Sequence, residues 1–196
     1  MDFIASEPCG PAECCWLSYE PGNAAAKGLY SSFGFVETGE WDGDEVIAVL
    51  KLNPDCSDVS VRYATTADED FWFSLDRHLS RDEYAHKVRD HMGYILARKG
   101  LPIAILRYSL FWDSIPFCTL LYVRDEEQRK GYGCLLMKHW EKDMKSKGYG
   151  LAMISTQEDE EAQHFYRAIG YKDCGELNLP FPGYEQPTEL IMGKAL

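Results

Sequence analysis

Residues 120–148 read LLYVRDEEQRKGYGCLLMKHWEKDMKSKG and contain three successive patterns. The apolar run 115–123, which ends in LLYV, predicts a buried strand. The segment 124–133 is polar and contains two glycines, which is typical of a loop. Apolar residues then recur at helical spacing over 134–148, which predicts a long amphipathic helix. The chain is therefore expected to pass from a strand, through a glycine-containing loop, into a helix.

The loop residues Gln128 to Gly133 have the properties of an anion site. Backbone N–H groups at a helix N-terminus point outward, with the positive end of the helix dipole behind them. Glycines allow the backbone to approach a diphosphate closely, and Arg129 and Lys130 add positive charge. A Walker loop would need Gly-Lys-Ser/Thr, and a dinucleotide fingerprint would need a third glycine where Leu136 stands. A simple tight turn is the alternative interpretation of the two glycines.

A second motif follows about thirty residues later, at 162–171, and reads AQHFYRAIGY. The Gln-x-x-Gly-x-Gly loop after LLYV resembles the acetyl-CoA loop of the GCN5-related N-acetyltransferase (GNAT) family. The second motif resembles the aromatic-Tyr and Gly-Tyr signature of the same family. Both are in the family's order and at its usual distance. The resemblance covers residues 58–196, which is the length of a whole GNAT domain.

The resemblance implies an α/β (α+β) fold with a mixed, mostly antiparallel sheet of about seven strands and flanking helices. It also implies acetyl-CoA as co-substrate. Tyr166 matches the tyrosine that protonates the departing thiolate in many members, and its alternative role is that of a core aromatic. Asp159 stands where many members have an Asn that contacts CoA. As an aspartate it can still cap the following helix, but it has no amide hydrogen to donate. The expected cofactor-binding residues are Leu121, Tyr122 and Val123 for the pantetheine arm, and Gln128, Arg129, Lys130, Gly131, Tyr132 and Gly133 for the pyrophosphate.

The chain also contains an internal repeat. Residues 23–40, NAAAKGLYSSFGFVETGE, align at an offset of 136 with residues 159–176, DEEAQHFYRAIGYKDCGE. The pattern of residues 14–52 predicts a strand, a helix and two strands. This stretch resembles the C-terminal part of a spermine/spermidine-type acetyltransferase. We therefore expect a partial GNAT-like unit without a CoA loop at 1–53, a linker at 54–57 and a complete domain at 58–196.

A partial unit of this kind leaves an unpaired sheet edge and an uncovered apolar face. The run VIAVLKL, 46–52, is rich in β-branched residues and would promote aggregation as an exposed edge. We therefore expect the unit to dock on the complete domain or on a second copy of the chain in a homodimer. Without the phosphate loop it is not expected to bind CoA.

The charge and composition restrict the partners of the chain. The net charge is −12, of which residues 1–57 contribute −8, and this argues against a nucleic-acid partner. An acidic face suits a polyamine or a basic peptide, although a solvated face explains the same charge. No apolar run reaches the length of a membrane span. Seven cysteines without a CxxC pair indicate reduced thiols and a cytoplasmic location.

The function expected from the resemblance is direct transfer of an acetyl group from acetyl-CoA to a primary amine of a small molecule, for which a polyamine is one candidate. An antibiotic or an amino-acid amine is a second candidate. The rival class is a catalytically silent acetyl-CoA-binding or interaction protein. The sequence contains no metal-ligand spacing and no nucleophile elbow. It does not distinguish among four candidate general bases, which are Asp113, Glu127, Glu158 and His164. Trp112 and Asp113 are also candidates for lining the acceptor side of the site.

Overall fold

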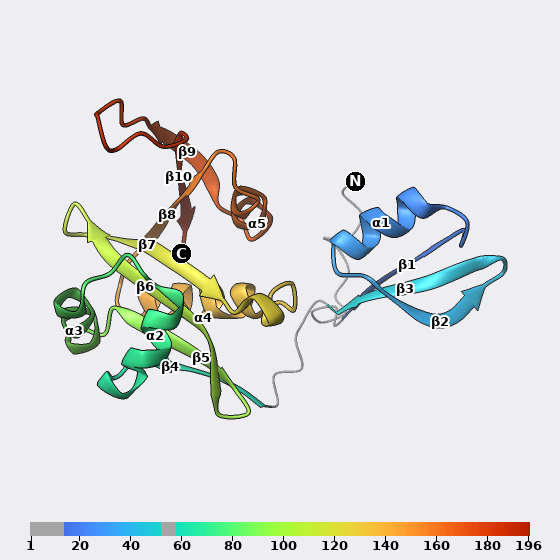
Figure 1. The fold of residues 1–196 in the computed structure, drawn as a ribbon, viewed down its shortest axis with the longest axis horizontal. Coiled ribbons are helices and arrows are strands. Elements are labelled where there is room, and N and C mark those ends of the chain that lie inside the picture. The colour runs from blue at the N-terminus through green and yellow to red at the C-terminus, as the bar shows by residue number, and fades with distance from the viewer. Residues whose placement is uncertain (1–13, 52–57) are drawn as a thin grey trace. The chain divides into compact units, whose positions relative to one another are not determined.

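The computed structural model describes residues 14–51 and 58–196, and it forms two compact units (Figure 1). The described part of the N-terminal unit is residues 14–51, and the C-terminal unit begins at Asp58. The proposed linker at 54–57 and the first thirteen residues of the expected partial unit lie outside the described residues. Among the described residues, no helix is both long and apolar enough to cross a membrane.

The N-terminal unit has the expected order of a strand, a helix and two strands. Its three strands form an antiparallel sheet in the order β1-β3-β2, so the β-branched run of β3 is the central strand and not an edge. Asn23 accepts a hydrogen bond from the amide of Ala26 at 3.0 Å and caps the helix as expected. The elements are β1 (Cys14–Tyr19), α1 (Ala24–Ser32), β2 (Val36–Asp42) and β3 (Glu45–Lys51).

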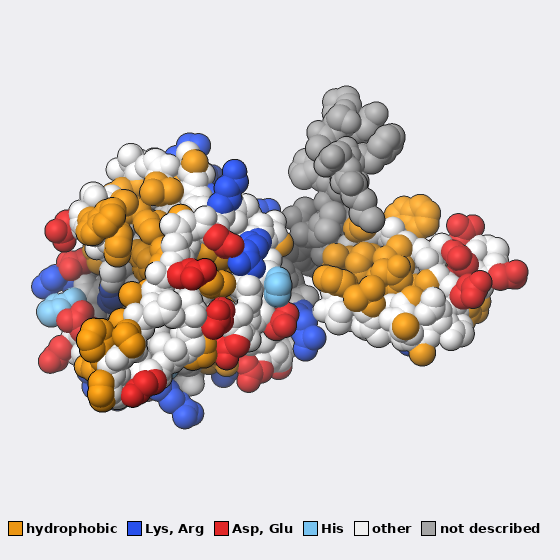
Figure 2. Space-filling model, turned by 90° about the horizontal axis from the view of Figure 1, so that it is seen from above, with side chains coloured by type: hydrophobic (Ala, Val, Ile, Leu, Met, Phe, Trp, Pro, Cys, Tyr) orange, Lys and Arg blue, Asp and Glu red, His pale blue; other side chains and the backbone are white. Residues whose placement is uncertain are grey.

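The core of this unit is small, and much of its apolar surface stays open. Tyr19, Val46 and Ala48 are buried, and the helix α1 contributes no fully buried residue. Figure 2 shows hydrophobic side chains gathered on the surface of this unit. Its large, exposed apolar side chains are Trp16, Leu29, Phe33, Val36 and Trp41.

The C-terminal unit is built on a seven-stranded sheet, as expected for the α/β fold class. The strand order is β4-β5-β6-β7-β8-β10-β9, and every neighbouring pair is antiparallel except β7 and β8. The strands are β4 (Val59–Tyr63), β5 (Gly93–Arg98), β6 (Leu101–Phe111), β7 (Ile115–Val123), β8 (Leu151–Gln157), β9 (Lys172–Leu177) and β10 (Glu189–Ala195).

Helices cover both faces of this sheet. The helices α2 (Glu69–Leu75) and α3 (Arg81–Arg89) pack through Trp72 and Tyr84 against one face. The long helix α4 (Tyr132–Ser146) covers the other face with its apolar stripe. Tyr166, from the short helix α5 (Ala162–Ala168), belongs to the same core cluster as α4. The stripe of α4 consists of Leu136, Met137, Trp140 and Met144, all fully buried.

The helix α2 is shorter than its sequence pattern indicates. The pattern predicts a helix over 67–78 after a cap at Thr66. In the structure a 3-10 turn, η2 (Thr66–Asp68), capped by Thr65, comes first, and α2 begins at Glu69 and ends at Leu75. The reason is the next residue, Asp76, which is 1% exposed and hydrogen-bonds to Arg107 of β6. This long-range contact takes Asp76 out of the helix.

The repeat in the sequence is also a repeat in local structure. Tyr30 and Tyr166 stand on equivalent helices, and the backbone bonds Phe35 N to Tyr30 O and Tyr171 N to Tyr166 O both measure 3.0 Å. Two residues after the end of each helix stands a glycine of positive φ, with +91° at Gly34 and +99° at Gly170. The strand order β1-β3-β2 matches β8-β10-β9, so both segments fold as the same strand–helix–strand–strand unit.

Candidate functional site

The strands β7 and β8 pair over a short distance and then separate. Their only paired residues are Phe117 with Met153 and Cys118 with Ile154. Beyond Cys118, β7 continues beside β6, and β8 continues beside β10. The edges of the two strands that face each other are therefore left without a strand partner, and an extended ligand can pair with backbone groups there.

A β-bulge lies at the point where the strands separate. In the backbone ladder, Arg107 of β6 pairs with Leu120 and Tyr108 pairs with Cys118. Thr119 is therefore the extra residue of the bulge, without a pairing partner in β6. The guanidinium of Arg107 donates to Thr119 Oγ1 at 2.8 Å and to the buried carboxylate of Asp76 at 2.7 Å. This ion pair holds the bulge, because a buried charge is costly without its partner. A bulge re-aims the strand beyond it.

The loop after β7 is held by its own side chains. A short 3-10 turn, η3 (Asp125–Glu127), follows the strand. Gln128, one of the expected cofactor residues, donates to the carbonyl of Val123 at 2.9 Å and to Asp125 Oδ1 at 3.0 Å. Gln128 therefore closes the loop on the end of β7, which fixes where the helix α4 begins.

The two glycines of the loop differ in what their backbone requires. Gly131 has φ of +84°, a conformation that favours glycine, and it stands directly before α4. Gly133 has no such conformation, and a Cβ built there would lie 3.5 Å from the ring of Phe165, an ordinary contact. Tyr132 buries its side chain in the core, so only its backbone is available to a ligand. The loop thus presents backbone N–H groups at the N-terminus of a 15-residue helix, which is the arrangement that binds phosphate.

Tyr166 lies in the core near the point where β7 and β8 separate. It is 7% exposed and packs in one cluster with Cys118, the last residue of β7 that pairs with β8. Burial raises the pKa of its phenol, and the Cys118 thiol and Glu160 raise it further. Among the described residues, its hydroxyl has no hydrogen-bond partner. The phenol is therefore protonated at neutral pH and has a proton to donate.

The other expected site residues lie in several places. Leu121, Tyr122 and Val123 form the end of β7 beyond the bulge, while Arg129 and Lys130 are exposed in the loop. Asp159 does not cap α5, because the N-cap position is Glu161, whose side chain makes no cap bond. Because β7 and β8 are parallel, their C-terminal ends lie toward the same end of the sheet, although the two strands have separated there.

The four candidate bases are not brought together. Asp113 lies in the β6–β7 turn, at the opposite end of β7 from the loop, and so does Trp112. Glu127 contacts Arg98 at 3.5 Å, and Glu158 accepts a bond from the amide of Thr188 at 3.4 Å. His164 is exposed on α5. Within the parts of the chain that the structure describes, no group of three or more His, Cys, Asp or Glu side chains could hold a metal ion.

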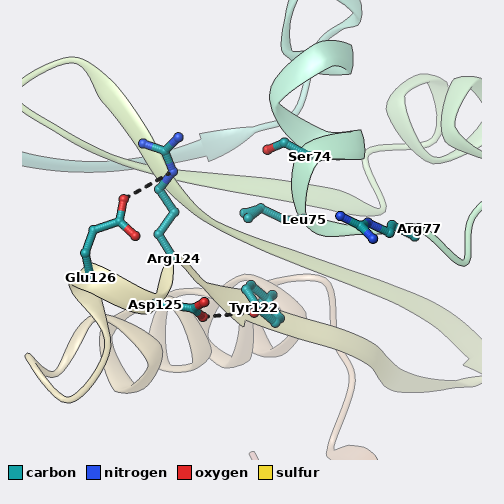
Figure 3. A pocket seen from close by; sticks show the side chains of 7 residues that line it. All are labelled: Ser74, Leu75, Arg77, Tyr122, Arg124, Asp125 and Glu126. Atoms are coloured by element: carbon teal, nitrogen blue, oxygen red, sulfur yellow. Dashed lines mark hydrogen bonds and ion pairs between the residues drawn. The ribbon is translucent and has the colours of Figure 1, made fainter.

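The sequence interpretation missed a pocket of about 420 Å³ beside the end of β7 (Figure 3). Tyr122, an expected cofactor residue, forms part of its wall. The other wall residues come from the end of α2 and from the loop after β7, which are about fifty residues apart. No local pattern brings two such distant segments together, so the pocket has no sequence signal. The lining residues are Ser74, Leu75, Arg77, Tyr122, Arg124, Asp125 and Glu126.

Comparisons with solved structures find the same fold. Ard1 from Thermoplasma volcanium has a TM-score of 0.63 at 14% identity, covering 71% of this chain and 98% of its own. The ribosomal-protein-S18-alanine N-acetyltransferase from Escherichia coli has a TM-score of 0.60 at 16% identity, with coverages of 70% and 93%. A GNAT family acetyltransferase from Elizabethkingia anophelis, solved with acetyl-CoA bound, has a TM-score of 0.56 at 17% identity, with coverages of 71% and 99%.

No curated protein matches the chain. The model of the acetyltransferase (GNAT) family matches residues 58–171, which is more than half of the 196 residues. The match includes the bulged strand β7, the glycine-containing loop, the start of α4, and Tyr166. The chain therefore belongs to the GNAT acetyltransferase family.

Proposed function

We propose that the protein is an N-acetyltransferase that transfers an acetyl group directly from acetyl-CoA to a primary amine of a small molecule. The observation that carries this proposal is the position of Tyr166. Its protonated hydroxyl, without a hydrogen-bond partner among the described residues, lies near the point where β7 and β8 separate. An acyl transfer with a thiolate leaving group needs an acid at such a place.

The residues around the gap between β7 and β8 support binding of acetyl-CoA. The backbone of Leu121, Tyr122 and Val123 would pair with the pantetheine arm, and the loop from Gln128 to Gly133 would hold the pyrophosphate. The free strand edge, the positive φ of Gly131 and the N-terminus of α4 all fit these groups. Arg129 and Lys130 would add charge near the phosphates.

The proposed transfer needs two proton movements. The amine loses a proton, its nitrogen bonds to the carbonyl carbon of the thioester, and the carbon–sulfur bond breaks. The departing thiolate then takes the phenolic proton of Tyr166, and the phenolate is reprotonated from solvent. No residue is assigned to the deprotonation of the amine.

Release of free thiol with a panel of amines, including polyamines and amino acids, tests the proposal. Transfer to at least one amine supports it. Tight acetyl-CoA binding without thiol release for any amine would favour the rival class, a catalytically silent binding protein.

The N-terminal unit is proposed to have a binding or scaffolding role. Its residues 14–51 contain no Gln-x-x-Gly-x-Gly loop before Tyr30, although Tyr30 is equivalent to Tyr166. Docking on the complete domain or on a second copy of the chain would cover its apolar side chains. Free thiols at Cys15, Cys118, Cys134 and Cys174 fit the proposed cytoplasmic location.

A further inference from the structure

We propose that Arg77 binds a carboxylate of the acceptor, so that the preferred acceptors are amines that carry a carboxylate, such as amino acids. This inference rests on the proposed N-acetyltransferase function. It concerns the pocket beside the end of β7, which the cofactor residues alone do not explain.

The pocket is adjacent to the place where transfer would occur. Tyr122 lines it and also belongs to the strand segment expected to contact the pantetheine arm. Its volume of about 420 Å³ is in the range of small-ligand sites. An amine bound here would therefore lie beside the strand that positions the thioester.

The charges in the pocket leave one cation without a partner. Arg124 contacts Glu126 at 3.8 Å and lies 5.6 Å from the ring centre of Phe71. Asp125 accepts hydrogen bonds from Tyr122 at 2.9 Å and from Gln128. Within the described parts of the chain, Arg77 has no ion pair or hydrogen bond for its guanidinium. In Figure 3 this guanidinium points toward Leu75, across the pocket from Arg124.

The backbone on both sides of Arg77 is fixed. Asp76 is buried and accepts bonds from Arg107 Nε at 2.7 Å and from the indole of Trp72 at 3.3 Å. Its second oxygen accepts from the amide of His78 at 3.1 Å. A buried carboxylate thus anchors the residues before and after Arg77, which places this side chain at the pocket with little loss of backbone entropy on binding.

The same anchor connects the pocket to the transfer site. Arg107, which binds Asp76, also donates to Thr119 in the bulge where β7 and β8 separate. The acceptor pocket and the divergence of the strands are therefore held by one buried ion pair. Since guanidinium and carboxylate groups match in a planar, two-bond geometry, an acceptor carboxylate is the group that Arg77 fits best.

Matched pairs of acceptors test this proposal on the full chain. Each pair consists of an amino acid and the amine that lacks only its carboxylate, for example lysine with 1,5-diaminopentane and ornithine with 1,4-diaminobutane. We expect kcat/KM to be at least tenfold higher for the amino acid of the preferred pair. In Arg77→Gln this ratio should fall about tenfold. Arg81→Gln is the control, because Arg81 is exposed, pairs with Glu69 and lies outside the pocket. A preference for the diamines, or an Arg77→Gln variant with an unchanged ratio, would overturn the proposal.

Acetyl-CoA carries phosphates, so it is a second source of an anion for Arg77. Measuring KM for acetyl-CoA and for its 3′-dephospho form in both proteins separates the two sources. We expect the Arg77→Gln substitution to leave both values unchanged. A higher KM for acetyl-CoA alone would assign Arg77 to the cofactor phosphate and overturn its role in acceptor binding.

A binding measurement keeps the pocket testable if no amine is acetylated. The Nε–H resonance of Arg77 in the full chain with CoA is followed by NMR during titration with lysine and with 1,5-diaminopentane. It is assigned by its loss in Arg77→Gln. We expect lysine to shift it and the diamine to leave it in place, with Arg81 unaffected. Without thiol release, the N-acetyltransferase proposal fails, but a lysine-specific shift would still support carboxylate binding. No shift with lysine or any other amino acid would overturn it.

Discussion

Tyr166 and Tyr30 show how one residue type differs between two copies of the same local structure. Both stand on a short helix before a glycine of positive φ. In both, the ring packs against the aromatic ring five positions later, with ring centroids 6.0 Å apart for Tyr166 and Tyr171 and 5.9 Å apart for Tyr30 and Phe35. Tyr166 is buried beside the end of the β7–β8 pairing, whereas Tyr30 is only half-buried. A proton donor is therefore expected at Tyr166 alone.

Replacement of Tyr166 by Phe tests this role. The change removes only the hydroxyl, which bonds to no group in the described residues, so the melting temperature and acetyl-CoA affinity should not change. If the thiolate takes its proton from Tyr166, kcat should fall by about 10²–10⁴, the range for general acids. Steady-state kinetics, with Tyr30→Phe as matched control, measure the effect. An unchanged kcat in Tyr166→Phe would mean that solvent or another group supplies the proton.

Asp68 is a second residue with a measurable role, in this case in stability. It is 6% exposed and accepts bonds from both Arg62 nitrogens and from the amide and hydroxyl of Thr65. The Arg62 guanidinium is the main cause that lowers the pKa of Asp68 from 3.8. Because the folded pKa is the lower one, this stabilisation is complete above pH 3.8 and is lost as the pH falls through the folded pKa.

We expect Asp68→Asn to lower the free energy of unfolding by about 2 kcal/mol at pH 7, since it removes charge-assisted bonds in a buried place. The difference from the wild type should shrink below the ordinary carboxyl pKa. Urea unfolding of the variant and the wild type at pH 7 and at pH 3 measures this difference in the free energy of unfolding at each pH. Asp90→Asn is the control, because Asp90 pairs with Arg89 at the surface, where loss of an ion pair changes the free energy of unfolding little. An Asp68→Asn difference that does not depend on pH would contradict the role of the ionised carboxylate.

At the scale of elements, the candidate site depends on how three segments end. The strand β7 leaves β8 after Cys118, the loop turns at Gly131, and the helix α4 starts immediately afterwards. Each of these ends has an identifiable cause, namely the bulge at Thr119, the positive φ of the glycine and the side-chain bonds of Gln128. The phosphate site is thus a property of the junction between a strand and a helix.

The two loop glycines give a matched test of this junction. Alanine at Gly131 must adopt φ near +84°, which costs about 1–2 kcal/mol. We therefore expect Gly131→Ala to weaken acetyl-CoA binding about tenfold or more, with a small loss in melting temperature. Valine there, being β-branched, would strain the loop further. Gly133→Ala should be tolerated, because its Cβ would make only ordinary contacts. Isothermal titration measures the acetyl-CoA affinity of Gly131→Ala, Gly133→Ala and the wild type, and circular dichroism compares their folds. Equal affinities for both variants and the wild type would argue against this loop as the pyrophosphate site.

At the scale of the whole molecule, we propose different roles for the two units. The seven-stranded unit holds the bulged strand, Tyr166 and the pocket. The three-stranded unit exposes Trp16, Phe33 and Val36. Residues 1–57, which include this unit, carry most of the net negative charge of the chain. Exposed apolar clusters of this kind mark surfaces that bind other protein surfaces.

A chain truncated to residues 58–196 tests this division. It should bind acetyl-CoA with near-normal affinity, because the cofactor residues are all present. It should also melt at a lower temperature or change its oligomeric state, because the docking proposed for the N-terminal unit would be lost. Light scattering, thermal melting and acetyl-CoA titration compare it with the full chain. A folded, monomeric truncated chain that binds no acetyl-CoA would show that the N-terminal unit is part of the cofactor site.

Local patterns carried much of the fold and of the candidate site. The order of the elements, the cap at Asn23, the loop before α4 and the place of Tyr166 all follow from neighbouring residues. The errors lie where distant residues compete with local propensity. Asp76 leaves the helical pattern because Arg107 binds it. The central position of β3 between β1 and β2 is a matter of strand pairing, which no short pattern encodes.

The sequence by itself determined the family, the two signatures, the repeat and the residues expected to bind acetyl-CoA, because each of these is written in a short run of the chain. The tertiary structure alone decided where β7 separates from β8, which ion pair holds the bulge, and that Arg77 faces a pocket beside Tyr122. The physical reason is that these features arise between segments thirty or more residues apart. Their contacts depend on how sheet and helices pack together, and this is not visible in the periodicity of any one segment.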